Sequence, residues 1–154
     1  MNKFMKLAID QALLGMENND GGPFGAIIVQ NGEIISFAHN EVVKTNDPTA
    51  HAEVVAIRKA SSKLSRFDLS DCEIYSSCEP CPMCFAAIHW AKIKKLYYGS
   101  TREDAANINF DDKYIYDVIK GTAKELQVEV LQINREESLE PFKKWKLKMD
   151  RVEY

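Results

Sequence analysis

Two short sequences carry the residue types that bind a transition metal. They are His51-Ala52-Glu53 and Pro80-Cys81-Pro82-Met83-Cys84. One imidazole and two thiolates are ligands that Zn²⁺ prefers, and three protein ligands leave a fourth position open for water, as catalytic zinc sites do. Cys81 and Cys84 are three residues apart, so they face the same way on the first turn of a helix. The spacing predicts one catalytic Zn²⁺ per chain, held by His51, Cys81 and Cys84.

Glu53 is the candidate proton carrier of this site. Bound zinc lowers the pKa of a water to about 7. Attack of the resulting hydroxide on an amidine carbon needs a group that takes the water's proton, gives it to a ring nitrogen and later protonates the leaving amine. Residues two apart on an ideal helix point about 200° from each other, so His51 and Glu53 can converge only at a helix end. Asp47 and Pro48 predict a helix start there, and the combined motifs match the zinc nucleobase deaminase signature.

The spacing of the cysteines also permits other kinds of metal site. Cys78, Cys81 and Cys84 are evenly spaced and could hold an iron–sulfur cluster, or a closed structural zinc site with Cys72 as fourth ligand. Cys72 opens a predicted buried strand, where cysteine behaves as a small hydrophobe. We therefore interpret Cys72 and Cys78 as bystanders. Cysteines clustered this way favour metal binding in a reducing compartment, which predicts a cytoplasmic protein.

Length and charge limit the classes of partner. A chain of 154 residues predicts one domain, residues 1–154, with residues 137–154 as a C-terminal helix or lid. Twenty Lys and Arg against 23 Asp and Glu give a formal charge of −3, which argues against a nucleic-acid partner. The first apolar run, residues 7–9, is interrupted by Asp10, so neither a signal peptide nor a membrane partner is predicted.

Periodicity and turn signals predict the elements that must position the motifs. Helices are expected over residues 4–15, 49–64, 82–91 and 112–120, with a last helix capped by Ser138. Strands are expected over residues 24–29, 34–39, 72–76, 96–98 and 128–133, the first two joined by an Asn31-Gly32 turn. This order predicts an α/β fold, a three-layer α/β/α sandwich around a mixed sheet.

Several segments together resemble the bacterial guanine deaminases, within the cytidine/deoxycytidylate deaminase superfamily. The segments are residues 21–26, 46–53, 77–84 and 110–112 and the ending Glu153-Tyr154. The resemblance spans essentially the whole chain. It implies zinc-dependent hydrolysis of guanine to xanthine and ammonia, by attack of zinc-bound hydroxide with Glu53 as proton shuttle. It also implies a five-stranded sheet between helices and a homodimer whose C-terminal segments can be exchanged.

The resemblance further implies roles in binding the purine. Asn40 would hydrogen-bond the base, because its amide both donates and accepts, and Phe24 would stack on the ring. Asp112 would accept from the N–H edge that distinguishes guanine. Trp90 and Tyr154 would help to close the pocket. Taken alone, Phe24 and Trp90 could equally be core residues, Asp112 a helix cap and Asn40 a turn residue.

Two other functions compete with guanine deamination. The first is deamination of the wobble adenosine of tRNA, which a basic tract near the C-terminus favours (Lys143, Lys144, Lys146, Lys148 and Arg151). A free base needs no basic groove, and the chain is net acidic, so we favour a small-molecule purine, guanine, over nucleic acid. The second is a non-enzymatic, zinc-stabilised interaction module, for which Glu53 would be dispensable.

Overall fold

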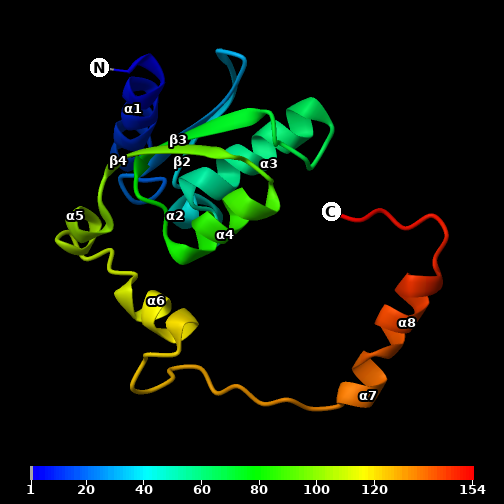
Figure 1. Cartoon of the computed structure of the whole chain (residues 1–154). Helices are drawn as coiled ribbons and strands as arrows, with labels where there is room; N and C mark the ends of the chain where they lie inside the picture. The colour runs from blue at the N-terminus through cyan, green and yellow to red at the C-terminus, as the bar shows by residue number, and fades with distance from the viewer. Residues whose placement is uncertain (1) are drawn as a thin grey trace.

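A computed structural model describes residues 2–154 and places a mixed β-sheet at the centre of the molecule (Figure 1). The strands are β1 (Gly25–Gln30), β2 (Glu33–His39), β3 (Cys72–Cys78) and β4 (Lys95–Ser100). Their order in the sheet is β2-β1-β3-β4. β1 is antiparallel to β2 and to β3, whereas β3 and β4 are parallel and are connected through a helix. The predicted mixed sheet is therefore confirmed.

The β1–β2 hairpin forms at the predicted turn. Asn31 and Gly32 both have positive φ, 50° and 82°, as a two-residue type I′ turn requires. Gln30 pairs with Glu33 directly across the turn. The Asn-Gly signal thus sets the register that pairs His39 with Gly25, the residue after the cavity-lining Phe24.

Helices cover both faces of the sheet and give the predicted three layers. α1 (Lys3–Glu17) lies on one face, and α3 (Ala52–Leu64) and α4 (Pro82–Trp90) lie on the other. Successive side chains of a strand point to opposite faces. Ile28 and Ile74 therefore join the core under α3, whereas Ile27, Val29 and Tyr75 join the core under α1. These two apolar layers hold the sheet that carries the site.

The contact between α1 and the end of β2 requires glycine at position 15. The helix does not end there as the sequence suggests but continues to Glu17. A Cβ added at Gly15 would lie 2.6 Å from the His39 ring, so a larger residue would displace the ring. His39 Nε2 in turn lies 2.7 Å from Asp20 Oδ2, which also accepts from Lys44. This network fixes the chain on either side of the first hairpin.

The sheet has four strands among the described residues, so the expectation of a fifth strand over residues 128–133 is wrong. Those residues are extended and exposed, and Val130 keeps 77% of its surface accessible. An extended apolar segment pairs as a strand only where a neighbouring strand edge meets it. We call residues 121–154 the tail, which leaves the sheet and curves back toward it (Figure 1).

Short helices connect the sheet to the tail and continue along it. They are α2 (Val42–Thr45), α5 (Arg102–Ala106), α6 (Lys113–Lys120), α7 (Arg135–Ser138) and α8 (Glu140–Leu147). Ser138 does not cap the last helix as predicted. Its hydroxyl donates to the Arg135 carbonyl within α7, and Leu139 precedes α8 instead. Over residues 2–154, every helix is too short or too polar to cross a membrane.

Candidate active site

Three donor side chains come from the starts of two helices. His51 is the N-cap of α3 and Cys81 is the N-cap of α4, and neither side chain makes a capping hydrogen bond. Both side chains are therefore free to meet in the space between the helices. Pro82 occupies the first turn of α4, as predicted. Cys84 follows within that first turn and is fully buried.

α3 begins later than the sequence predicts. Asp47 does not cap it, because Asp47 Oδ1 accepts hydrogen bonds from the backbone N–H of Thr49 (2.8 Å) and from its hydroxyl (2.7 Å) in a separate turn. The helix begins at Ala52. His51 therefore stands just outside the helix and Glu53 stands in its first turn, which is the helix-end arrangement that lets both side chains face one site.

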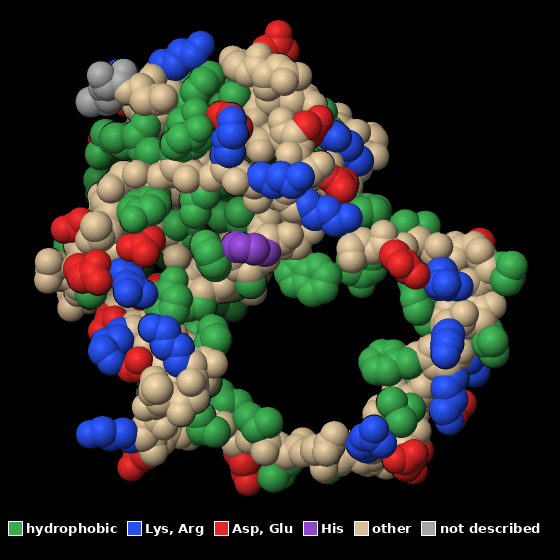
Figure 2. Space-filling view, viewed as in Figure 1, with side chains coloured by type: hydrophobic (Ala, Val, Ile, Leu, Met, Phe, Trp, Pro, Cys, Tyr) green, Lys and Arg blue, Asp and Glu red, His purple; other side chains and the backbone are tan. Residues whose placement is uncertain are grey.

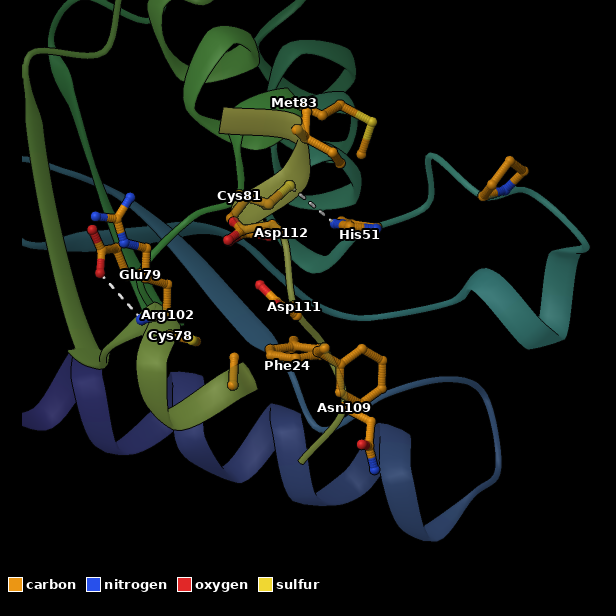
Figure 3. A pocket seen from close by; sticks show the side chains of 15 residues that line it. Phe24, His51, Cys78, Glu79, Cys81, Met83, Arg102, Asn109, Asp111 and Asp112 are labelled. Atoms are coloured by element: carbon orange, nitrogen blue, oxygen red, sulfur yellow. Dashed lines mark hydrogen bonds between the residues drawn. The ribbon is translucent and has the colours of Figure 1, made fainter. Parts of the chain in front are cut away.

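The spacing of the three donors fits a tetrahedral zinc ion. His51 Nδ1 lies 3.6 Å from Cys81 Sγ and 3.5 Å from Cys84 Sγ, and all three donor atoms lie within 4.8 Å of one another. Zn–S bonds of about 2.3 Å and Zn–N bonds of about 2.05 Å, at tetrahedral angles, separate nitrogen from sulfur by about 3.5 Å. Figure 3 shows the His51 ring turned toward Cys81.

The charges of these donors also suit a cation. A hydrogen bond from the Cys84 thiol, together with one from His51, lowers the pKa of Cys81. The hydrogen bond with Cys81 raises the pKa of Cys84, whose thiol keeps its proton. The hydrogen bond with Cys81 also raises the pKa of His51. Three donor atoms thus share protons in a small, largely buried space, and a divalent ion would replace those protons.

Glu53 lies buried beside this group. Only 6% of its surface is accessible, and its Oε1 accepts a hydrogen bond from Ser76 Oγ at 3.0 Å. Desolvation by burial raises the pKa of Glu53, which brings a carboxyl group closer to the range where it both accepts and returns a proton. Ser76 lies on β3, so the sheet itself fixes the orientation of this carboxyl.

A cavity of about 420 Å³ opens onto His51, Cys81 and Glu53. Phe24 lies opposite His51 and Cys81 in Figure 3, and its ring meets the ring of Phe110 edge to face, with centroids 5.0 Å apart. Such a pair presents an apolar wall with room for a planar ring. A cavity this large holds a purine with space to spare.

Asp112 is one of the acidic residues that line the cavity. It precedes α6 but makes no side-chain capping bond. The adjacent Asp111 accepts from the Lys113 backbone N–H instead, at 2.8 Å. Burial, with the nearby Cys81, raises the pKa of Asp112. Asp112 thus occupies the N-cap position of α6 without capping the helix through its side chain, which leaves its carboxyl available to a ligand.

Asn40 lies next to this cavity without lining it. Its side chain is buried, and its Oδ1 accepts from the Val42 backbone N–H at 3.1 Å. Its own backbone N–H donates to the Phe24 carbonyl at 3.0 Å, so these two predicted purine contacts are tied together. A Cβ added at Gly21 would lie 2.0 Å from Asn40 Oδ1, so glycine is required there.

Trp90 and Tyr154 are placed together, away from the cavity that their own chain forms. Their ring centroids are 6.1 Å apart, and Tyr154 also lies 6.2 Å from the Phe67 ring. Trp90 is 68% exposed, so it is not a core residue. The two predicted closing residues thus share one exposed surface at the end of α4.

Sequence reasoning did not assign several residues of this cavity. Phe110 lies two residues before Asp112 in the sequence, and that proximity was the available signal. Arg102 follows the last strand with no motif around it, and only the fold brings it to the cavity. Cys78 also lines the cavity, but burial raises its pKa to about 11, so it remains a thiol. Cys72 lies at the opposite end of β3 and cannot complete a four-cysteine site.

The fold and the donor group agree with one class of protein. Residues 1–100 match the family described as the cytidine and deoxycytidylate deaminase zinc-binding region, and the chain belongs to that family.

Within this family, the chain is similar to the guanine deaminase of Bacillus subtilis (strain 168). The two are 46% identical over 151 residues, which cover 98% of this chain and 97% of that protein. The crystal structure of the Bacillus subtilis enzyme matches with a TM-score of 0.94, covering 100% of this chain and 99% of that chain. The tRNA-specific adenosine deaminase of Aquifex aeolicus (strain VF5) is 44% identical over 97 residues, 63% of this chain and 64% of that protein. A solved relative in complex with 2,6-diaminopurine is 33% identical with a TM-score of 0.68, covering 71% of this chain and 61% of that chain.

Proposed function

We propose that this protein converts guanine to xanthine and ammonia by zinc-dependent hydrolysis. The observation that carries the proposal is the 46% identity to a guanine deaminase over 98% of the chain. The site supports it, since a zinc-type donor group opens onto a cavity that also contains a buried glutamate and an unpartnered carboxyl. Four free cysteines, two of them proposed metal ligands, suit a reducing compartment, so we place the enzyme in the cytoplasm.

In this proposal His51, Cys81 and Cys84 hold one Zn²⁺. Bound zinc supplies Lewis acidity, which lowers the pKa of a water to about 7. Glu53 would take one proton from the attacking water and deliver it to a purine ring nitrogen. It would then take the second proton from the hydroxyl formed on the attacked carbon and deliver it to the leaving amine, which departs as ammonia. Its hydrogen bond from Ser76 holds the carboxyl toward the cavity through these transfers.

The base is oriented by groups on two sides of the cavity. Phe24 stacks on the purine, and Phe110 supports that ring edge to face. Asp112 accepts hydrogen bonds from the N–H groups of guanine, which adenine does not present in that arrangement. Asn40 would hydrogen-bond the base from behind Phe24, to whose carbonyl its backbone N–H donates.

We further propose a homodimer in which the tails are exchanged. The tail displays apolar side chains with no cover, including Phe142 and Leu147, and Met149 is 96% exposed. Figure 2 shows hydrophobic side chains on both sides of the opening that the tail encloses. Trp90 and Tyr154 do not reach the cavity of their own chain, so a second copy is needed for them to close one. Residues 137–154 then act as a lid on the single domain.

The experiment that tests the function compares a free base with RNA. Purified zinc-loaded protein is incubated with guanine or with tRNA, and the products are measured as ammonia and xanthine or as inosine. We expect guanine turnover and unmodified tRNA. The basic side chains of the tail support this expectation, since Lys143, Lys148 and Arg151 each pair with an acidic neighbour. Inosine in tRNA with guanine untouched would contradict the proposal.

Deleting residues 150–154 is expected to lower kcat/KM for guanine about 10- to 100-fold, because an open site admits water and positions the base poorly. Zinc content should stay near one ion per chain, since the donors lie far from the tail in sequence. Ammonia release and metal analysis measure the two effects.

Mixing two impaired chains distinguishes an exchanged tail from an unexchanged one. One chain carries Glu53→Gln with an intact tail, and the other lacks residues 150–154 but keeps Glu53. If tails are exchanged, the mixed dimer contains one complete site and regains activity, whereas each protein alone does not. Activity that fails to return while native mass spectrometry shows mixed dimers would overturn the exchange.

A further inference from the structure

Asp112 lies on a segment that the core does not hold. α6, which Asp112 precedes, has no buried residue among those described. The segment begins beyond the last strand and extends away from the sheet (Figure 1). A carboxyl that discriminates between purines must nevertheless keep a fixed position. Specific contacts must therefore anchor α6 to the site.

Tyr116 supplies such a contact. It lies one turn after Asp112, and its backbone N–H donates to the Asp112 carbonyl at 3.2 Å. Residues four apart share a helix face, so both side chains face the same part of the molecule. The Tyr116 hydroxyl donates to the Pro80 carbonyl at 3.3 Å. Pro80 directly precedes the metal-ligand candidate Cys81, and Figure 3 shows Asp112 beside Cys81.

Arg102 holds the Tyr116 ring from another direction. Its guanidinium lies 4.8 Å from the ring centroid, a cation–π distance. The Arg102 backbone N–H donates to Glu79 Oε2 at 3.1 Å, so Arg102 is itself attached to the loop that contains Pro80. The side chain of Tyr116 is thus held between the end of β4 and the loop that follows β3.

We infer that Tyr116 is a positioning residue for purine recognition, which holds Asp112 in register with the metal-ligand loop through its hydroxyl bond to Pro80. The inference rests on the proposed function only for the identity of the base. It assigns specificity to a residue that touches neither metal nor substrate. Loss of the hydroxyl should make the start of α6 more mobile, so that the Asp112 carboxyl no longer keeps one position.

The test substitutes Tyr116→Phe in the zinc-loaded enzyme. Loss of one hydrogen bond predicts a fall of about 2- to 10-fold in kcat/KM for guanine. The loss should appear in KM rather than kcat, because Asp112 binds the ground state and the transition state alike. Hydrogen exchange of residues 109–120 should become faster, and this readout needs no substrate. Tyr98→Phe, the same change at a half-exposed position on β4, is the matched control and should alter neither readout.

A double-mutant cycle separates positioning from general stability. In an Asp112→Asn background, adding Tyr116→Phe should cost little further kcat/KM, because both changes act through one carboxyl. Additive losses would overturn the inference, and so would unchanged exchange in residues 109–120. If the unmodified enzyme fails to turn over guanine, the proposed function is wrong, while the exchange result still decides whether Tyr116 anchors α6.

Discussion

Glu53→Gln is expected to lower kcat for guanine by about 10²- to 10⁴-fold, the range typical for loss of a positioned proton carrier. Glutamine has nearly the same shape and can still accept from Ser76 Oγ, the 3.0 Å bond that orients the native carboxyl. It cannot accept and return a proton. Zinc content and thermal stability should therefore stay close to those of the unmodified protein, and the loss should fall on kcat.

Ammonia release under saturating guanine and metal analysis of the same samples measure this separation. Glu73→Gln is the matched control, because Glu73 pairs with Lys95 at the surface, 2.9 Å away, and lies outside the cavity. Turnover that survives Glu53→Gln with zinc still bound would remove the proton-shuttle role. It would also favour the alternative of a zinc-stabilised module, for which Glu53 is dispensable.

Removing zinc is expected to abolish guanine turnover without unfolding the sheet. The apolar layers under α1 and α3 are built from side chains such as Ile27, Ile28 and Ile74, and the metal donors do not belong to them. Chelation should therefore lower the melting temperature but preserve the circular dichroism of the folded chain. Restoring Zn²⁺ should restore activity, because the donor group can reassemble between two formed helix starts.

Substitution of single cysteines makes the same point without a chelator. Cys84→Ala should lose zinc and activity together, since it leaves two protein ligands. Cys72→Ala is the matched control, because Cys72 is also buried but lies at the other end of β3. Global unfolding on chelation, or zinc retained in Cys84→Ala, would contradict the predicted site.

The sequence predicted best where the local chain determines the structure. Asn31-Gly32 selects its own turn, and Pro82 starts α4 from the first turn. The donor types of His51, Cys81 and Cys84 do not depend on their neighbours, so the metal group followed from spacing alone. Asp47 shows the limit of this reasoning. The sequence predicted that its side chain caps the helix, but in the structure it accepts a hydrogen bond from the Thr49 backbone N–H in a separate turn.

The parts that the sequence did not predict depend on contacts between distant segments. Residues 128–133 are apolar enough for a strand but meet no strand edge within residues 2–154. Arg102 reaches the cavity only because β4 ends beside the loop after β3. The placement of Trp90 beside Tyr154 depends on the path of the whole tail. Local sequence patterns contain no information about such contacts between distant segments.

The division of the chain at Ser100 has a consequence for its synthesis. Every strand of the described chain lies before or at that residue. The three metal-donor residues and Glu53 also precede it. On a ribosome, which makes about 5 to 20 residues per second, the sheet and its donor group can therefore form before the rest of the chain emerges. Asp112, the proposed recognition carboxyl at the start of α6, and the proposed lid come afterward. A nascent chain would acquire its capacity for metal before it contained Asp112. In the proposed exchanged dimer, it would gain its lid only on meeting a second finished copy.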